Sequence, residues 1–213
     1  MNIVITCGPS YEPIDQVRRI TNFSTGRLGV TLANAFTEAG HRVICLKGEQ
    51  ATNPGECRAA QLQSFTTNDD LAAKLQSLRD QKIDAIFHAA ALCDFRVASV
   101  ESLDGEKLSS KKFPTRGDAL TLKLVPTPKI LPQLREWFPS AKIVGWKYEL
   151  EGSRNDVIEK GYRQIEEAHT DACVVNGAAY GEGFGICDGS TGTLNEIPTV
   201  EMLGSFLANW ASL

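Results

Sequence analysis

The sequence predicts a three-layer, Rossmann-like α/β fold, in which a doubly wound and mostly parallel sheet carries a flap or hairpin excursion. Short, unbroken apolar runs alternate with segments of helical period, and small or polar residues follow directly after the runs. Such alternation is typical of parallel strands joined by right-handed crossovers. The length of 213 residues fits a single α/β domain over residues 1–213.

The chain opens with a strand. Residues 2–7 form an unbroken apolar run, as expected for a strand that is buried on both faces. Apolar side chains then recur at helical spacing over 28–39, and Gly40 is placed to end that helix. Residues 42–46 are again short and apolar, which predicts a second strand.

The middle of the chain continues this alternation and then interrupts it. Asn68 can cap the next helix, and residues 83–91 are predicted to form a buried strand that ends in small residues. Residues 95–121 are polar and rich in lysine, so we expect a flap, a long functional loop or a hairpin excursion there. The alternating pattern over 120–125 predicts a half-exposed strand.

The last part of the chain contains two helix-start signals. Thr127 followed by Pro128 predicts a helix that begins there and runs through Trp137. Ser153 and Asp156 have the spacing of a capping box, which predicts the start of another helix. The remaining predicted elements are strands over 142–148 and 172–175, a Gly-rich segment over 177–192 and a terminal helix that starts near Pro198.

Composition and charge exclude several classes of function. Lys and Arg total 22 against 26 for Asp and Glu, so the net charge of −4 offers no basic field to nucleic acid. No apolar run approaches the ~20 residues that span a bilayer, and the N-terminus lacks the features of a signal peptide. The six cysteines form no C-x-x-C pair and are too sparse for a disulfide scaffold. We therefore expect a soluble cytoplasmic protein that binds neither nucleic acid nor membranes.

The fold class indicates where a ligand binds. In an open α/β sheet, ligands lie beyond the carboxyl ends of the strands, where the strand order reverses. Small or polar residues occupy four such positions, at 8–10, 89–94, 145–147 and 176–177. In the first loop, Ser24, Gly26 and Gly29 can bring backbone N–H groups and the positive end of a helix against a phosphate. These glycines equally suit close packing of the helix on a strand. Asn22, in the same long loop, is either a ligand contact or a turn former.

Each further candidate also has a structural alternative. Asp94 follows three alanines and can orient a ligand hydroxyl, amide or base edge, or it can cap a turn. Lys107 belongs to a lysine-rich flap, which is either a solvated surface or a mobile lid that carries an ammonium to a phosphate. Trp146 at a strand end can stack on a base or pack in the core. The three histidines lie at no metal-ligand spacing, so we expect no structural metal site.

Five blocks of sequence carry a family resemblance. They are GPSYEPIDQVRRITNFSTGRLG, HAAALCDFRV, EKLSS with the following ALTLKLVPTPKIL, GWKYELEG, and ACVVNG. In this order, and across nearly the whole chain, they resemble blocks of the phosphopantothenoylcysteine synthetase family in its free-standing form. These proteins are the phosphopantothenate–cysteine ligases of coenzyme A biosynthesis. The first block is long and specific.

The resemblance implies a ligase that joins phosphopantothenate to L-cysteine. CTP or ATP, with Mg²⁺, would activate the carboxylate as an acyl-nucleotidyl intermediate with loss of pyrophosphate, and the cysteine amine would then attack this intermediate. The resemblance implies a homodimer and no flavin. Because the triphosphate supplies the leaving group, the protein must contribute placement and charge neutralisation.

The resemblance also assigns roles to residues. Asn22 would hold the activated acyl carbonyl, and Lys107 would offset charge on the reacting α-phosphate. Arg18 matches an arginine that reaches into a neighbouring subunit's site. Nucleotide contacts are implied for Gly8, Ser24, Gly26, Gly29, Trp146 and Asn176. The pocket in which pantothenate meets the nucleotide would be lined by Ala90, Ala91 and Asp94.

Several positions depart from the family pattern, and two of them bear on the choice of nucleotide. Lysines of bacterial CTP-dependent members fall at Gln164 and Ala168, with Arg163 as the nearest cation, so the choice between CTP and ATP stays open. These departures keep a catalytically silent nucleotide- or phosphopantothenate-binding module as an alternative. An NAD(P)-dependent Rossmann oxidoreductase fits less well, because no G-x-G-x-x-G follows the first strand.

Overall fold

The computed structural model describes residues 1–113 and 119–212. Its main sheet has six parallel strands, namely β1 (Asn2–Cys7), β4 (Arg42–Gly48), β5 (Gln61–Phe65), β6 (Ala85–His88), β10 (Lys142–Tyr148) and β11 (Ala172–Asn176). Two antiparallel strands, β12 (Phe184–Asp188) and β13 (Leu194–Ile197), extend one edge. The order across the sheet is β13-β12-β11-β10-β6-β1-β4-β5.

This strand order contains a reversal. From β1 the chain adds β4 and β5 on one side, then returns to add β6, β10 and β11 on the other. The helices that follow β1 and β6, α1 (Arg27–Glu38) and α3 (Leu134–Trp137), lie on opposite faces of the sheet, and the carboxyl edge at such a reversal is where ligands of open α/β sheets bind. The predicted doubly wound, mostly parallel sheet is confirmed.

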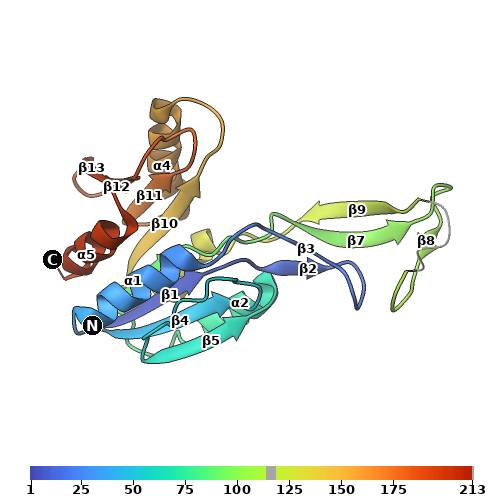
Figure 1. Cartoon of the computed structure of the whole chain (residues 1–213), viewed down its shortest axis with the longest axis horizontal. Helices are drawn as coiled ribbons and strands as arrows, with labels where there is room; N and C mark the ends of the chain where they lie inside the picture. The colour runs from blue at the N-terminus through green and yellow to red at the C-terminus, as the bar shows by residue number, and fades with distance from the viewer. Residues whose placement is uncertain (114–118, 213) are drawn as a thin grey trace.

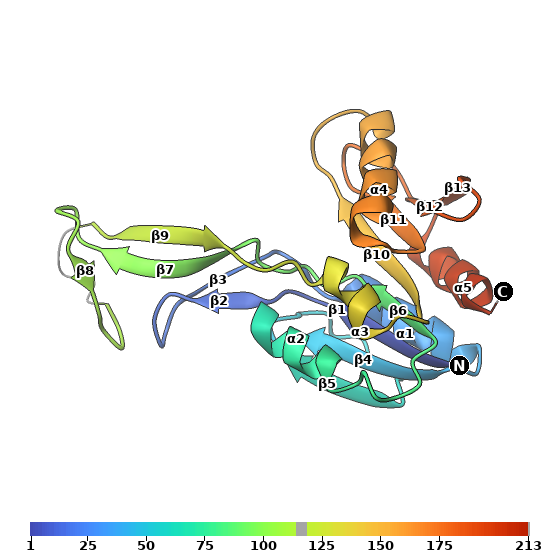
Figure 2. The same ribbon diagram turned by 180° about the vertical axis from the view of Figure 1, so that it is seen from behind.

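Helices cover both faces of the sheet (Figures 1 and 2). One face carries α1 (Arg27–Glu38) and α5 (Val200–Ala211), and the other carries α2 (Asn68–Gln76), α3 (Leu134–Trp137) and α4 (Arg154–Ala168). Successive residues of a strand pack in opposite cores, because strand side chains alternate between the two faces of the sheet. Ile3 packs in the α1/α5 core, whereas Val4 packs against α2 and α3.

The excursion is an arm that projects from the sheet (Figure 1). It is an antiparallel sheet of β7 (Phe95–Glu101), β8 (Lys107–Leu108) and β9 (Thr121–Pro126), in the order β8-β7-β9. The strand predicted over 120–125 is β9; the excursion predicted over 95–121 contains β7 and β8 and ends at the first residue of β9. Residues 114–118 of the predicted flap lie outside the described residues.

A short hairpin lies beside the arm. It consists of β2 (Tyr11–Pro13) and β3 (Arg19–Thr21), within the loop that the sequence predicted as irregular. At its tip, the amide of Gln16 donates to the Lys111 carbonyl (3.0 Å) and the amide of Phe113 donates to Asp15 Oδ2 (3.1 Å). The hairpin is thereby fastened to the arm.

Three predicted element ends are wrong, and side-chain hydrogen bonds explain two of them. Thr67, not Asn68, caps α2, because its hydroxyl accepts from the amide of Asp70 (3.2 Å). Thr127 begins no helix, since its hydroxyl donates to the Cys93 carbonyl (2.6 Å); helical structure starts at the 3₁₀ turn η1 (Leu131–Gln133). The strand predicted over 83–91 spans Ala85–His88.

Other predicted elements agree with the structure. The strands at 2–7 and 142–148 have the predicted bounds. Ser153 and Asp156 form the predicted capping box at the start of α4. Within residues 1–113 and 119–212, no helix has both the length and the apolar character needed to cross a bilayer.

Candidate functional site

The loops after β1 and β6 are hydrogen-bonded to each other at the strand-order reversal. Asn22 Nδ2 donates to the carbonyl oxygens of Ala91 (3.2 Å) and Leu92 (2.9 Å). The amide of Ala91 donates to the Gly8 carbonyl (2.9 Å), and the amide of Ser10 donates back to the Ala91 carbonyl (3.2 Å). The structure therefore brings predicted residues of two separate blocks, Asn22, Gly8 and Ala91, into one place.

Glycine is required where these loops approach each other. Gly8 and Gly26 have φ values of +78° and +76°, and a Cβ at either position would lie 2.8 or 3.0 Å from Ala51 Cβ. Gly26 precedes the first turn of α1 and has no side chain to cap it, and Thr25 Oγ1 accepts from the amide of Arg27, the first residue of the helix (3.3 Å). The backbone N–H groups of this first turn, together with the dipole of α1, suit an anion. Gly29 serves packing, because a Cβ there would lie 2.1 Å from Cys7 Cβ.

Ser24 lies in the chain between Asn22 and Gly26. Its amide donates to the Asn22 carbonyl (2.9 Å), which closes a tight turn, and its side chain is half-buried. Of the predicted phosphate loop, Gly8 and Gly26 lie close together beside Ala51, whereas residues 11–21 between them form the β2–β3 hairpin.

Trp146 lies two residues before the end of β10, Asn176 ends the neighbouring strand β11, and both side chains lie on the α1 face of the sheet. The Trp146 ring packs with the core that contains Val144 and Val174, and Asn176 follows Val174 by two residues, so both point to that face. Trp146 Nε1 and Asn176 Oδ1 are buried without a hydrogen-bond partner among the described residues. A buried donor and a buried acceptor without protein partners have hydrogen-bonding capacity that an ordered water or a ligand can fill.

A buried polar network fixes the base of the arm. Asn68 Oδ1 accepts from Ser10 Oγ (2.7 Å), and its Nδ2 donates to the Cys93 carbonyl (2.8 Å) and to Thr127 Oγ1 (3.1 Å). These bonds join the loops after β1, β6 and β9 to the start of α2. Asn is a common helix-cap residue, so the sequence suggested a cap at Asn68, and the role of its side chain in joining these loops was not predicted.

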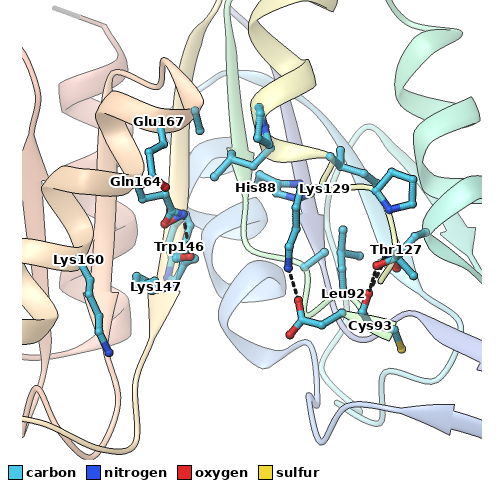
Figure 3. Close-up of a pocket in the computed structure, with 18 of the residues that line it drawn as sticks. His88, Leu92, Cys93, Thr127, Lys129, Trp146, Lys147, Lys160, Gln164 and Glu167 are labelled. Atoms are coloured by element: carbon cyan, nitrogen blue, oxygen red, sulfur yellow. Dashed lines mark hydrogen bonds and ion pairs between the residues drawn. The ribbon is translucent and has the colours of Figure 1, made fainter. Parts of the chain in front are cut away.

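A cavity of about 550 Å³ opens on the other face of the sheet, between residues 127–132, which include the start of η1, and α4 (Figure 3). Predicted residues Ala90, Asp94 and Trp146 line it. Asp94 forms an ion pair with Lys129 across its mouth. Its remaining lining includes Leu92, Pro128, Ile130, Leu131 and Pro132, which make one wall apolar.

The α4 wall of this cavity carries charge. Glu149 accepts from Lys160 Nζ (2.6 Å) and lies 3.3 Å from Lys147 Nζ. The hydrogen bond from Lys160, together with that from Lys147, holds the pKa of Glu149 below its usual value. Gln164 is neutral, and both ends of its side-chain amide are hydrogen-bonded within the protein. Its Nε2 donates to the Trp146 carbonyl (3.3 Å), and its Oε1 accepts from the Cys173 thiol (3.2 Å).

His88 also lines the cavity, at the end of β6 (Figure 3). Its Nδ1 lies 2.8 Å from the Thr6 hydroxyl. Burial lowers the pKa of His88 to about 4, so the ring is neutral at pH 7. His88 was not among the predicted site residues, because in the sequence it is one of three scattered histidines; its place at the end of a buried strand was a usable signal.

Two predicted residues lie away from the others. Arg18 Nη1 pairs with Asp15 Oδ2 (2.9 Å), and its guanidinium donates to the Phe113 carbonyl (3.2 Å), at the junction of hairpin and arm. Lys107 is exposed on β8, at the outer end of the arm (Figure 1). Within one chain, the structure does not bring Arg18 or Lys107 to Asn22. Residues 1–113 and 119–212 contain no group of three or more His, Cys, Asp or Glu side chains that could hold a metal ion.

Fold and site together define a Rossmann-like α/β protein with a glycine-lined helix start at its strand-order reversal. The chain belongs to the family described as the DNA/pantothenate metabolism flavoprotein C-terminal domain, whose model matches residues 1–199. This finding confirms the family resemblance of the sequence blocks.

Relatives and solved structures agree with this membership. The chain is 33% identical over 174 residues to the coenzyme A biosynthesis bifunctional protein CoaBC of Thermococcus kodakarensis and 30% identical to that of Methanocaldococcus jannaschii. These matches cover 82% of this chain but 40% of each relative, so the chain spans less than half of their length.

Two solved structures share the fold. A DNA/pantothenate metabolism flavoprotein from Streptococcus pneumoniae superimposes with a TM-score of 0.87 at 22% identity, covering 100% of this chain and 98% of that one. A Cab2 H337A complex with phosphopantothenate-cysteine gives a TM-score of 0.74 at 19% identity, covering 99% and 87% of the two chains.

Proposed function

We propose that the chain is a ligase of coenzyme A biosynthesis that joins phosphopantothenate to L-cysteine through an acyl-nucleotidyl intermediate. The observation that carries the proposal is the bond between Asn22 and the Ala91–Leu92 backbone, next to the glycine-lined start of α1. It puts an amide side chain beside an anion site at the strand-order reversal. The names of the curated relatives, and the ligand of one fold neighbour, support the same reaction.

In this proposal the triphosphate lies on the α1 side of the sheet. Its phosphates would contact the backbone at Gly8 and Gly26, the Ser24 hydroxyl and the first-turn N–H groups of α1. The base and ribose would lie against Trp146 and Asn176, whose buried Nε1–H donor and Oδ1 acceptor lack protein partners within the described chain. Mg²⁺ would accompany the triphosphate, which is CTP or ATP.

The chemistry needs two displacements. A carboxylate oxygen of phosphopantothenate attacks the α-phosphorus and expels pyrophosphate, and the cysteine amine then attacks the acyl carbon and expels the nucleoside monophosphate. Neither step needs a flavin. The pantothenate would meet the nucleotide beside Ala90, Ala91 and Asp94.

Asn22 would stabilise the acyl carbonyl as negative charge develops on its oxygen. Both N–H bonds of its amide are engaged here, with Ala91 and Leu92. We propose that the longer bond, to Ala91, opens so that this N–H donates to the substrate, while the bond to Leu92 keeps the side chain in place.

We further propose that the protein works as a cytoplasmic homodimer, because Lys107 lies at the outer end of the arm and so away from Asn22 of its own chain. Exposed apolar side chains mark the arm and hairpin as a contact surface: Val17, Phe95, Leu103, Leu120 and Leu124. Lys107 and Arg18 would then act at the partner's site. The free cysteines suit a reducing compartment.

A pyrophosphate-release assay tests the function. CTP and ATP are each supplied with and without phosphopantothenate and with and without L-cysteine. We expect pyrophosphate only when triphosphate and acid are both present, and phosphopantothenoylcysteine only when cysteine is added. Nucleotide binding without pyrophosphate release would instead identify a silent binding module. Turnover of NAD(P)H would identify an oxidoreductase.

A further inference from the structure

Phe23, the residue after Asn22, carries an aromatic ring that the rest of the described chain leaves in water. Its relative exposure is 111%, the highest among the large apolar residues that the structure describes, whereas Phe36, Phe65 and Phe87 are fully buried. A phenyl ring in water forgoes the free energy that its burial provides. Single apolar residues are nevertheless common on protein surfaces, so exposure alone assigns no function to Phe23. Its position does.

The backbone on both sides of Phe23 is held in place. Before it, the Thr21 hydroxyl donates to the Ser10 carbonyl (2.7 Å), and the Asn22 side chain is bonded to the loop after β6. After it, the amide of Ser24 donates to the Asn22 carbonyl (2.9 Å), so Phe23 is the central residue of a three-residue turn. Fixed hydrogen bonds, and not a loose segment, therefore keep this ring in solvent.

Phe23 separates two residues to which the proposed function gives different parts of one intermediate. Asn22 would hold the acyl carbonyl, and Ser24 would contact the phosphates of the nucleotide. The bond between these two parts is a mixed anhydride, which water attacks as well as an amine does. Water attack would return phosphopantothenate and the nucleoside monophosphate, so the triphosphate would be consumed without product. A ligase of this type therefore has to keep water from the acyl carbon.

We propose that the Phe23 ring packs against the acyl-nucleotidyl intermediate and excludes water from its acyl carbon, so that the cysteine amine is the acceptor. In the reaction that the ring suppresses, the water oxygen bonds to the acyl carbon and the bond from this carbon to the phosphate oxygen breaks. The nucleoside monophosphate leaves, and the two protons of the water pass to the solvent. Phe23 is thus a positioning residue that decides between two nucleophiles. This inference rests on the proposed ligase function.

The arm of a second copy is the competing cover for this ring. Val17, one of the exposed apolar residues of the proposed contact surface, lies at the tip of the β2–β3 hairpin. Phe23 lies beyond the other end of β3, where the Asn22 side chain is bonded to the loop after β6. The hairpin strand thus separates Phe23 from that surface, and the residues next to Phe23 in the chain are those proposed to bind the intermediate.

The coupling of pyrophosphate release to amide formation tests the inference. Without cysteine, the wild type with phosphopantothenate and CTP or ATP should release pyrophosphate in a single burst, because the intermediate is protected. Phe23→Ala should continue to release it, about tenfold faster than the wild type does after its burst, which is the effect expected from one phenyl contact. With cysteine, the wild type should form one amide per pyrophosphate, and Phe23→Ala should form clearly less.

Matched variants separate this role from a structural one. Leu62→Ala removes another exposed apolar side chain, on the edge strand β5, and should keep wild-type coupling. Phe23→Leu should keep most of the coupling that Phe23→Ala loses. Because the ring is in solvent, both Phe23 variants should unfold at the wild-type temperature.

The outcomes distinguish this inference from the proposed function. No pyrophosphate release by the wild type with either triphosphate would overturn the ligase function and the inference with it. Release by the wild type with equal coupling in Phe23→Ala would overturn the inference alone. Equal coupling together with a weaker dimer in sedimentation would assign the ring to the partner's arm, which also contradicts the inference.

Discussion

Asn22 Nδ2 donates to the carbonyl oxygen of Leu92 at 2.9 Å and so joins two loops that are 70 residues apart in the sequence. Both loops leave the sheet where the strand order reverses, one after β1 and the other after β6. The bond holds an amide side chain between the start of α1 and the alanine-lined strand end. Most of the predictions below test what this arrangement does.

Replacement of Asn22 by Asp should stop product formation. A carboxylate cannot donate to the Ala91 and Leu92 carbonyls, and it would repel the oxygen on which charge develops. We expect a loss of about 10²–10³ in turnover, as for other lost oxyanion donors. Product formation is measured by mass spectrometry, with Asn209→Asp, an exposed position on α5, as a control of equal charge change. Normal turnover of Asn22→Asp would reject the assigned role.

Gly26→Ala should be more destabilising than Gly40→Ala. Both glycines have a left-handed conformation, with φ values of +76° and +83°, so each alanine costs about 1 kcal/mol of backbone strain. At Gly26 the new Cβ also lies 3.0 Å from Ala51, whereas nothing lies within 4 Å at Gly40. Urea unfolding and tryptophan fluorescence with Mg-CTP or Mg-ATP measure both effects. The account requires that only Gly26→Ala lose nucleotide binding.

Lys107→Gln should abolish acyl-nucleotide formation and leave the fold intact, because this side chain is exposed on the arm. Pyrophosphate release measures the first effect and thermal unfolding the second. Lys123→Gln, on β9 of the same three-stranded sheet, is the matched control and should remain active.

Mixing two inactive variants tests where Lys107 acts. If it serves the partner's site, a mixed dimer of Lys107→Gln and Asn22→Asp contains one complete site. Random mixing should then restore about a quarter of wild-type activity. No recovery from mixtures that demonstrably exchange subunits would place Lys107 in its own chain's site.

His88 should make stability depend on pH in acid. Its pKa in the folded protein, about 4, lies below the usual value of 6.5, so the unfolded chain takes up a proton first as pH falls. Its stabilising contribution is complete above pH 6.5 and is lost as pH falls toward 4, by about 2–3 kcal/mol at pH 4.5. Urea unfolding from pH 7 to 4.5 should show this drop in the wild type. In His88→Gln, which has no titrating ring there, an equal drop would contradict the assignment.

Elements with strong apolar patterns could be predicted, whereas half-exposed edge elements could not. The strand at Asn2–Cys7 is buried on both faces and therefore reads as one apolar run. The edge strand at Gln61–Phe65 has mostly polar, solvent-facing side chains, so its sequence gave no strand signal. Thr127 was misread for a related reason: its hydroxyl bonds to Cys93, a tertiary contact that the local Thr-Pro pattern cannot reveal.

The site was predictable where it follows directly from strand ends. Asn22, Gly8 and Ala91 meet because parallel strands place their carboxyl ends at one edge of the sheet. The partners of Asn68 and His88 come from strands and loops far away in sequence, so no local pattern indicated them. The positions of Arg18 and Lys107 depend on the direction of the arm, which is set by the Asn68 network at its base.

An oxygen-label experiment tests the central claim most directly. Phosphopantothenate with an ¹⁸O-labelled carboxylate is incubated with Mg²⁺, L-cysteine and either CTP or ATP, and the products are analysed by mass spectrometry. If the carboxylate attacks the α-phosphorus, the released nucleoside monophosphate carries one ¹⁸O and the pyrophosphate carries none. Label in inorganic phosphate, or unlabelled nucleoside monophosphate alongside amide product, would contradict the acyl-nucleotidyl route.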